Sequence, residues 1–139
     1  MEGRRDVEKA PLSKEEVHKL QAVLRGYRLT KDQQTLLQSD LKKYEGTKPF
    51  HNFTKGLKPG QASANRYIES FHVQDLVLID GLEWIPTQVL GQSFLLHQIR
   101  KMVSVAVDIG LGVAPLEVLD KALSKKEVIR VVQTFSILF

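Results

Sequence analysis

The longest apolar stretch of the chain, residues 94–113, limits the fold more than any other segment. Its polar exceptions recur every three or four residues, so in a helix they would line up along one side while apolar residues cover the rest of the circumference. These exceptions are His97, Arg100, Ser104 and Asp108. The pattern predicts a buried helix over residues 92–111 with a single polar seam.

Arg100 needs a partner if it lies inside such a helix. A buried guanidinium is costly unless a carboxylate, a phosphate or water faces it. Asp108 lies two helical turns away, which is too far for an intrahelical ion pair. We therefore expect Arg100 to face a functional site. The alternative is an arginine that ends a buried seam and pairs with a carboxylate of a neighbouring strand.

Three further helices are expected from capping signals and apolar spacing. Ser13 with Glu16 forms a capping box that predicts a helix ending at Gly26, and Thr30 predicts a second helix over residues 31–44. The apolar face of the first helix consists of Val17, Leu20, Val23 and Leu24. A short third helix is expected over residues 115–123, beginning at Pro115.

Strands are expected at 66–73, at 76–79, at 83–90 and at 127–132. Asp80-Gly81 is a hairpin turn signal, and Pro86 favours an edge position for the third of these strands. In the strand expected at 66–73, strict alternation would place Tyr67, Glu69, Phe71 and Val73 on one face. Residues 45–63 are interpreted as a loop rich in glycine, proline and lysine.

Size and composition indicate one ordinary globular unit. The chain has 139 residues, of which 42% are hydrophobic and 26% charged. Residues 1–11 are expected to be a flexible N-terminus and residues 12–139 an α/β unit. No apolar run is long enough to cross a membrane, no secretory signal opens the chain, and the absence of cysteine excludes disulfides and thiolate metal sites. We therefore expect a protein that is neither membrane-bound nor secreted.

Positive charge is concentrated in the first part of the chain. Residues 1–58 hold 13 Lys and Arg against 8 Asp and Glu, whereas the remainder holds 7 against 8. A basic half of this kind favours a polyanionic partner, although a solvated helical surface explains the same charge count.

Several segments closely resemble the C-terminal half of eukaryotic TruA-like tRNA pseudouridine synthases. The most specific is the string GQSFLLHQIRKM at residues 91–102. The others are Tyr44-Glu45-Gly46-Thr47, Phe50-His51-Asn52-Phe53-Thr54, Arg66-Tyr67-Ile68 and Glu83-Trp84-Ile85. The resemblance implies an α/β (α+β) fold with a mixed, largely antiparallel sheet flanked by helices. It also implies isomerisation of uridine to pseudouridine in RNA without a cofactor or a metal.

The resemblance assigns roles to individual residues. Arg100 matches the arginine that pairs with the catalytic aspartate of the other half, and is the expected catalytic residue. The expected RNA-binding residues are His51, Asn52, Lys55, Lys58, Arg66, His97 and Lys101. A structural role remains the alternative for the histidines, and solvated surface the alternative for the lysines. The expected partner is tRNA or another structured RNA, in the nucleus or mitochondrion as the family suggests, or otherwise in the cytoplasm.

This chain departs from the family pattern at the aspartate loop. The family loop resembles Gly-Arg-Thr-Asp-Lys-Gly, and Gly3-Arg4-Arg5-Asp6 echoes it only superficially. We therefore expect a truncated synthase that lacks its catalytic aspartate and is inactive alone. A non-catalytic RNA-binding fragment and a protein-interaction module are the alternatives. The sequence leaves the oligomeric state open.

Overall fold

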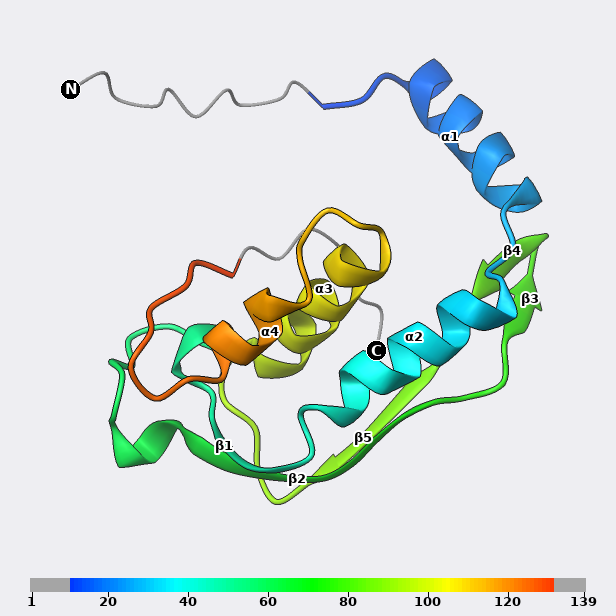
Figure 1. Ribbon diagram of the computed structural model, residues 1–139. Coiled ribbons are helices and arrows are strands. Elements are labelled where there is room, and N and C mark those ends of the chain that lie inside the picture. Colours follow the sequence, from blue (N-terminus) through cyan, green and yellow to red (C-terminus); the bar gives the residue numbers. More distant parts are fainter. Residues whose placement is uncertain (1–10, 132–139) are drawn as a thin grey trace.

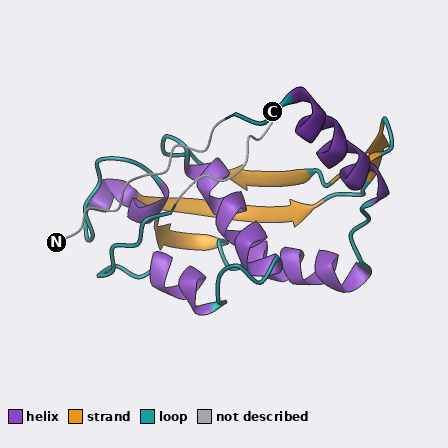
Figure 2. Ribbon diagram, turned by 90° about the horizontal axis from the view of Figure 1, so that it is seen from above, coloured by secondary structure: helices purple, strands orange, loops and turns teal. Residues whose placement is uncertain are grey.

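The computed structural model describes residues 11–131, and these form an α+β fold (Figure 1). Its elements, in chain order, are α1 Lys14–Gly26, α2 Lys31–Lys42, β1 Gly46–Pro49, η1 His51–Phe53, η2 Ala62–Ala64, β2 Asn65–Val73, β3 Val77–Ile79, β4 Leu82–Trp84, β5 Thr87–Gly91, α3 Gln98–Gly110 and α4 Glu117–Ala122. Helices α2, α3 and α4 lie on one face of the sheet (Figure 2). The expected fold class is confirmed.

The main sheet is antiparallel, in the order β1-β2-β5. Its central strand, β2, is irregular because the pairing with β5 shifts register between Ile68 and Ser70. The extra residue turns both Ile68 and Phe71 toward the core, where they are fully buried. The strict alternation expected for this strand is therefore wrong.

Aromatic rings fill the space between the sheet and the helices. Tyr44, Phe50, Phe53 and Phe71 are all fully buried, and the ring centroids of their contacting pairs lie 5.5 to 6.3 Å apart. The Tyr44 hydroxyl donates a 2.8 Å hydrogen bond to the carbonyl oxygen of Met102 on α3. This bond ties the end of α2 to α3, the helix that carries the candidate arginine.

The first helix belongs to a separate outer layer. The predicted capping box at Ser13 is present, and the predicted cap at Thr30 is itself a capping box that Gln33 completes. Helix α1 packs on the β3–β4 hairpin, whose turn has positive φ at Asp80 and Gly81 as the sequence predicted. No residue of α1 is buried, and Leu24 is 53% exposed. The apolar face of α1 is therefore largely exposed in the part of the chain that the structure describes.

Four expected elements need correction. The long helix begins at Gln98 rather than 92, because residues 92–97 leave β5 as a loop. The expected strand at 83–90 is two strands separated at residues 85–86, and the expected loop at 45–63 contains β1. Residues 127–131 form no strand, and residue 132 lies outside the described range.

Candidate functional site

The connection from β5 to α3 is a tightly constrained loop. It follows Gly91, where an added Cβ would lie 2.8 Å from the carbonyl oxygen of Tyr67, so only glycine fits without displacement of the backbone. It ends at His97, whose φ of 62° is left-handed and uncommon for a residue with a side chain. Such a conformation persists where surrounding contacts fix it.

Two side chains supply these contacts. The Oε1 atom of Gln98, a fully buried residue, accepts a 2.8 Å hydrogen bond from the amide of Leu95. The Thr54 hydroxyl donates a 2.9 Å bond to the carbonyl oxygen of Leu96. The loop is thus held from the first residue of α3 and from the residue after η1. From the sequence, Thr54 was expected to hold its own loop by local hydrogen bonds, whereas here it bonds to a loop distant in sequence. Sequence reasoning did not identify Gln98 as a positioning residue, although it lies within a motif that carries the resemblance.

A hollow of about 320 Å³ opens beside this loop. Residues 94–100 line it, and we call it the α3 hollow. Arg100 is half-buried there, in the first turn of α3, whereas His97 and Leu96 are exposed, Leu96 by 65%. The structure therefore places His97 and Arg100 on the same hollow, but with His97 before the helix rather than within its seam.

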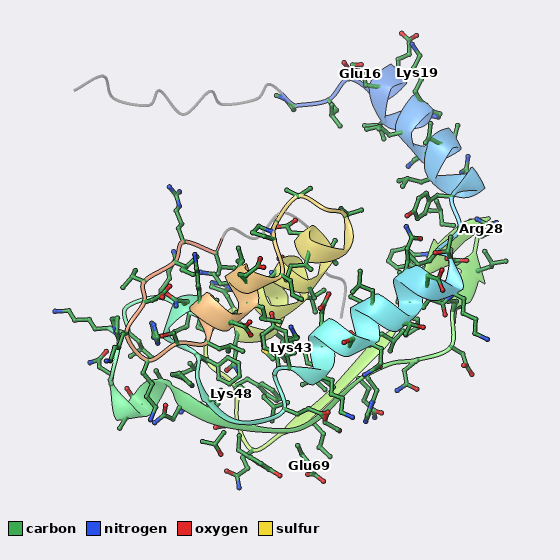
Figure 3. The ribbon with its side chains drawn as sticks, in the orientation of Figure 1. Glu16, Lys19, Arg28, Lys43, Lys48 and Glu69 are labelled. Carbon is green, nitrogen blue, oxygen red and sulfur yellow. The ribbon has the colours of Figure 1, made fainter. Side chains whose placement is uncertain are left out.

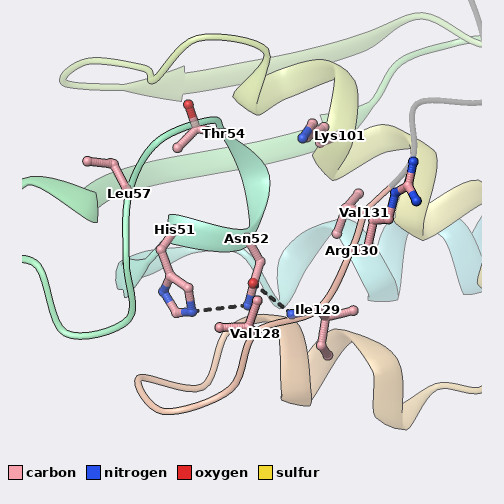
Figure 4. A pocket seen from close by; sticks show the side chains of 9 residues that line it. All are labelled: His51, Asn52, Thr54, Leu57, Lys101, Val128, Ile129, Arg130 and Val131. Atoms are coloured by element: carbon pink, nitrogen blue, oxygen red, sulfur yellow. Dashed lines mark hydrogen bonds between the residues drawn. The ribbon is translucent and has the colours of Figure 1, made fainter.

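A second hollow, of about 310 Å³, lies beside η1 and the loop that follows it (Figure 4). We call it the η1 hollow. Its lining residues are His51, Asn52, Thr54, Leu57, Lys101, Val128, Ile129, Arg130 and Val131. Three expected RNA-binding residues, His51, Asn52 and Lys101, therefore come together here, and Arg130 joins them without having been singled out from the sequence.

Asn52 fastens the segment after α4 to the rest of the fold. Its Nδ2 donates to the carbonyl oxygens of Ala122 and Glu127, each at 3.0 Å, and its Oδ1 accepts from the amide of Ile129 at 2.9 Å. Only 6% of Asn52 is exposed. This side chain thereby defines the wall of the η1 hollow, because residues 128–131 follow the path that it sets.

His51 takes one tautomer in this network. Its Nε2 lies 2.7 Å from the carbonyl oxygen of Glu127, a distance that requires Nε2–H to donate. The 3.1 Å approach of the Asn52 amide nitrogen to the same Nε2 is then a contact between two donors. The Nδ1 atom of His51 is buried without a partner in the described chain. His51 thus supports the backbone through Nε2.

The remaining expected RNA-binding residues lie on the surface around these hollows. Lys55 and Lys58 are exposed in the loop between η1 and η2. Arg66 is half-buried at the start of β2, where its Nη1 donates to the carbonyl oxygens of Ser63 and Asn65 at 2.8 and 2.9 Å. Neither the lysines nor Arg66 lines either hollow.

Within residues 11–131, no group of three or more His, Asp or Glu side chains is arranged to hold a metal ion. In the same range, no helix has the length and apolar character needed to span a bilayer.

Comparison with known proteins gives a consistent result. A sequence family described as tRNA pseudouridine synthase matches residues 41–136. The chain is 39% identical to tRNA pseudouridine synthase 1 of Schizosaccharomyces pombe over 105 residues, which is 76% of this chain and 20% of that protein. It is 40% identical to the Homo sapiens protein named pseudouridylate synthase 1 homolog over 102 residues, which is 73% of this chain and 24% of the human protein.

A third relative is the Saccharomyces cerevisiae tRNA pseudouridine(27/28) synthase, which is 39% identical over 100 residues, 72% of this chain and 26% of the yeast protein. The chain therefore spans about a fifth to a quarter of the length of these relatives.

Proposed function

Because this chain belongs to the tRNA pseudouridine synthase family, we propose that it forms part of a catalytic domain that isomerises uridine to pseudouridine in tRNA. In this proposal Arg100 is the catalytic residue that the chain contributes. The carboxylate with which it pairs comes from a polypeptide segment outside these 139 residues.

The position of Arg100 supports the proposal most directly. The side chain is half-buried in the first turn of α3 and lines a hollow of about 320 Å³. A carboxylate that entered this hollow would meet both the guanidinium and the positive end of the α3 helix dipole. Both interactions favour the ionised carboxylate and lower its pKa.

An ionised carboxylate is the chemical requirement of a nucleophilic aspartate. Arginine suits this role better than lysine because its planar fork orients both carboxylate oxygens and does not lose its proton near neutral pH. The side chains of Gln98 and Thr54 are hydrogen-bonded to the preceding loop and fix the point at which α3 begins. They thereby fix the place from which Arg100 projects.

RNA contact is proposed for two exposed lysines, for the half-buried Lys101 and for the rim of the α3 hollow. Lys55, Lys58 and Lys101 would neutralise phosphates, and the exposed His97 would contact the substrate near Arg100. For His51 and Asn52, the burial and the backbone hydrogen bonds favour a supporting role beneath the η1 hollow.

The first experiment asks whether the chain contains its own nucleophile. The 139-residue chain is incubated with a tRNA transcript, and pseudouridine is detected by chemical mapping. We expect no product. Measurable turnover would show that an aspartate of this chain acts as the nucleophile. It would overturn the proposal that Arg100 and the catalytic carboxylate come from different polypeptide segments.

The second experiment tests Arg100 in a complete enzyme. The segment of the Schizosaccharomyces pombe relative that matches this chain is replaced by the chain itself, and pseudouridine formation is compared for the chimera and for its Arg100→Lys variant. We expect kcat to fall by at least about 100-fold, as removal of a preorganised charge partner does in other active sites, while tRNA affinity stays within about threefold. Arg25→Lys on α1 is the matched control and should be neutral.

A protein-interaction module remains a second candidate, because the apolar face of α1 is exposed. Leu20 is 49% and Leu24 53% exposed, and exposed apolar stripes of this kind mark contact surfaces. Retention of chimera activity in a Leu20→Ser, Leu24→Ser variant would separate this surface from the catalytic role.

A further inference from the structure

Residues 46–68 contain Lys48, Lys55, Lys58 and Arg66 but no aspartate or glutamate. This segment alone therefore carries a formal charge of +4, equal to that of the whole chain. It runs from β1 through η1 and η2 into β2, so its two ends lie next to each other in the sheet. The fold thus brings the first and last cations of the segment together.

Lys48 and Arg66 are direct partners across the β1–β2 ladder. Figure 3 shows Lys48 on β1, which is an edge strand of the sheet. Directly opposed residues on antiparallel strands project from the same face with Cβ atoms roughly 5 Å apart, and like charges in this arrangement destabilise the pair. Neither Lys48 nor Arg66 forms an ion pair with a carboxylate of residues 11–131.

The guanidinium of Arg66 is already oriented. Its Nη1 donates to the carbonyl oxygens of Ser63 and Asn65, while its Nε is buried and has no hydrogen-bond partner in the described chain. Because Nε is buried, an external acceptor would approach the guanidinium through Nη2, which makes no hydrogen bond within residues 11–131. A charge-assisted hydrogen bond from a guanidinium nitrogen to a phosphate oxygen is stronger than one between neutral groups.

We propose that Lys48 and Arg66 form a clamp for one backbone phosphate of an RNA strand. Arg66 supplies a directional donor through Nη2, and Lys48 supplies a flexible point charge from the facing strand. The proposal rests on the proposed RNA-modifying function, since it is that function that makes an RNA phosphate the ligand. It adds Lys48 to the expected contacts and assigns both side chains to the same phosphate.

Sharing one phosphate makes the clamp testable. Binding of a fluorescently labelled tRNA transcript to the 139-residue chain is measured by anisotropy as a function of salt for wild type, Lys48→Gln, Arg66→Gln and the double variant. Each neutralised phosphate contributes about one unit to the slope of log affinity against log salt. We expect each single variant to weaken binding about three- to tenfold, and the double variant to lose about one unit of slope in total.

Other outcomes would overturn the clamp in distinguishable ways. Loss of about two units of slope in the double variant would mean two separate phosphate contacts. Unchanged affinity and slope in all three variants, with wild type still binding tRNA, would refute the clamp and leave the proposed function intact. If wild type does not bind tRNA at all, both the clamp and RNA recognition by this chain are refuted, whereas the activity of the chimera still tests the catalytic proposal.

A second arm separates RNA from free phosphate. Amide shifts of residues 46–50 and 63–68 are followed by NMR on addition of inorganic phosphate, with sodium chloride at matched ionic strength as the reference. We expect saturation only at millimolar phosphate or above. Saturation at the tRNA concentrations used above would identify a site for free phosphate and overturn the RNA assignment.

Two controls address charge and folding. Lys31→Gln removes an exposed cation at the start of α2 and should leave the salt slope unchanged. Arg66→Lys keeps the charge but removes the fork, so it should preserve the slope while weakening affinity. Circular dichroism must show that the Arg66 variants are folded, and Lys48→Gln tests the clamp by itself if they are not.

Discussion

Replacement of Asn52 by alanine should destabilise the fold strongly, because this one side chain connects three backbone segments. It makes two hydrogen bonds through Nδ2 and one through Oδ1, to groups that follow it by 70 to 77 residues. A buried hydrogen bond contributes about 1 kcal/mol net, and a buried group left without a partner costs about 1 to 3 kcal/mol. We expect Asn52→Ala to lower the free energy of unfolding by about 3 kcal/mol.

The isosteric change Asn52→Asp separates hydrogen bonding from packing. Aspartate fills the same volume, but its carboxylate would face the carbonyl oxygens of Ala122 and Glu127, which accept from Nδ2 in the native structure. At pH 7 the loss should therefore be at least as large as for alanine. Asn65→Ala removes an amide that is exposed on β2 and serves as the matched control.

Two measurements test the prediction. Urea unfolding followed by circular dichroism gives the change in free energy, and hydrogen exchange reports the amide of Ile129, which should lose its protection in both Asn52 variants. A loss below about 1 kcal/mol for Asn52→Ala, with the Ile129 amide still protected, would refute the view that Asn52 holds residues 127–131 against the η1 hollow.

Three smaller predictions concern the core and the sheet. Gly91→Ala should cost about 2 kcal/mol in urea unfolding, because its Cβ would meet the carbonyl oxygen of Tyr67 at 2.8 Å. Tyr44→Phe should cost about 1 kcal/mol, because it leaves the carbonyl oxygen of Met102 without its donor. Burial raises the pKa of the Asp40 carboxyl, against a smaller opposing effect of the Lys43 charge. The stability from this group is therefore greatest at acid pH and is lost as pH rises through its folded-state pKa. Asp40→Asn should raise the unfolding free energy by about 1 kcal/mol at pH 7 and by less at pH 3.

Features that depend on a few neighbouring residues could be predicted from the sequence. The predicted helix caps at Ser13 and Thr30 form because side chain and backbone lie within one helical turn. The Asp80-Gly81 turn forms because these residue types tolerate the positive φ that a tight hairpin needs. These predictions required no knowledge of the distant parts of the chain, and they are confirmed.

Features that depend on distant contacts could not be predicted in the same way. The apolar residues 94–96 continue the periodicity of α3, yet the backbone there follows contacts made by Thr54 and by Tyr67, which are distant in sequence. Residues 127–131 are rich in β-branched side chains, which favour a strand. Their backbone groups instead form hydrogen bonds with the side chains of His51 and Asn52 rather than with a neighbouring strand. Local propensity is overridden in both places by tertiary hydrogen bonds.

The start of α3 at Gln98 changes the physical argument about Arg100. In the middle of a buried helix, a guanidinium would need compensation on desolvation grounds alone. In the first turn it stands at the rim of a hollow, half-buried, with the exposed His97 just before it. The desolvation penalty of the guanidinium is then smaller. Burial alone therefore no longer requires a compensating group beside Arg100. The positive end of the α3 helix dipole adds to the charge of Arg100 rather than offsetting it. The site is thus electrostatically suited to an anion that enters from outside the helix.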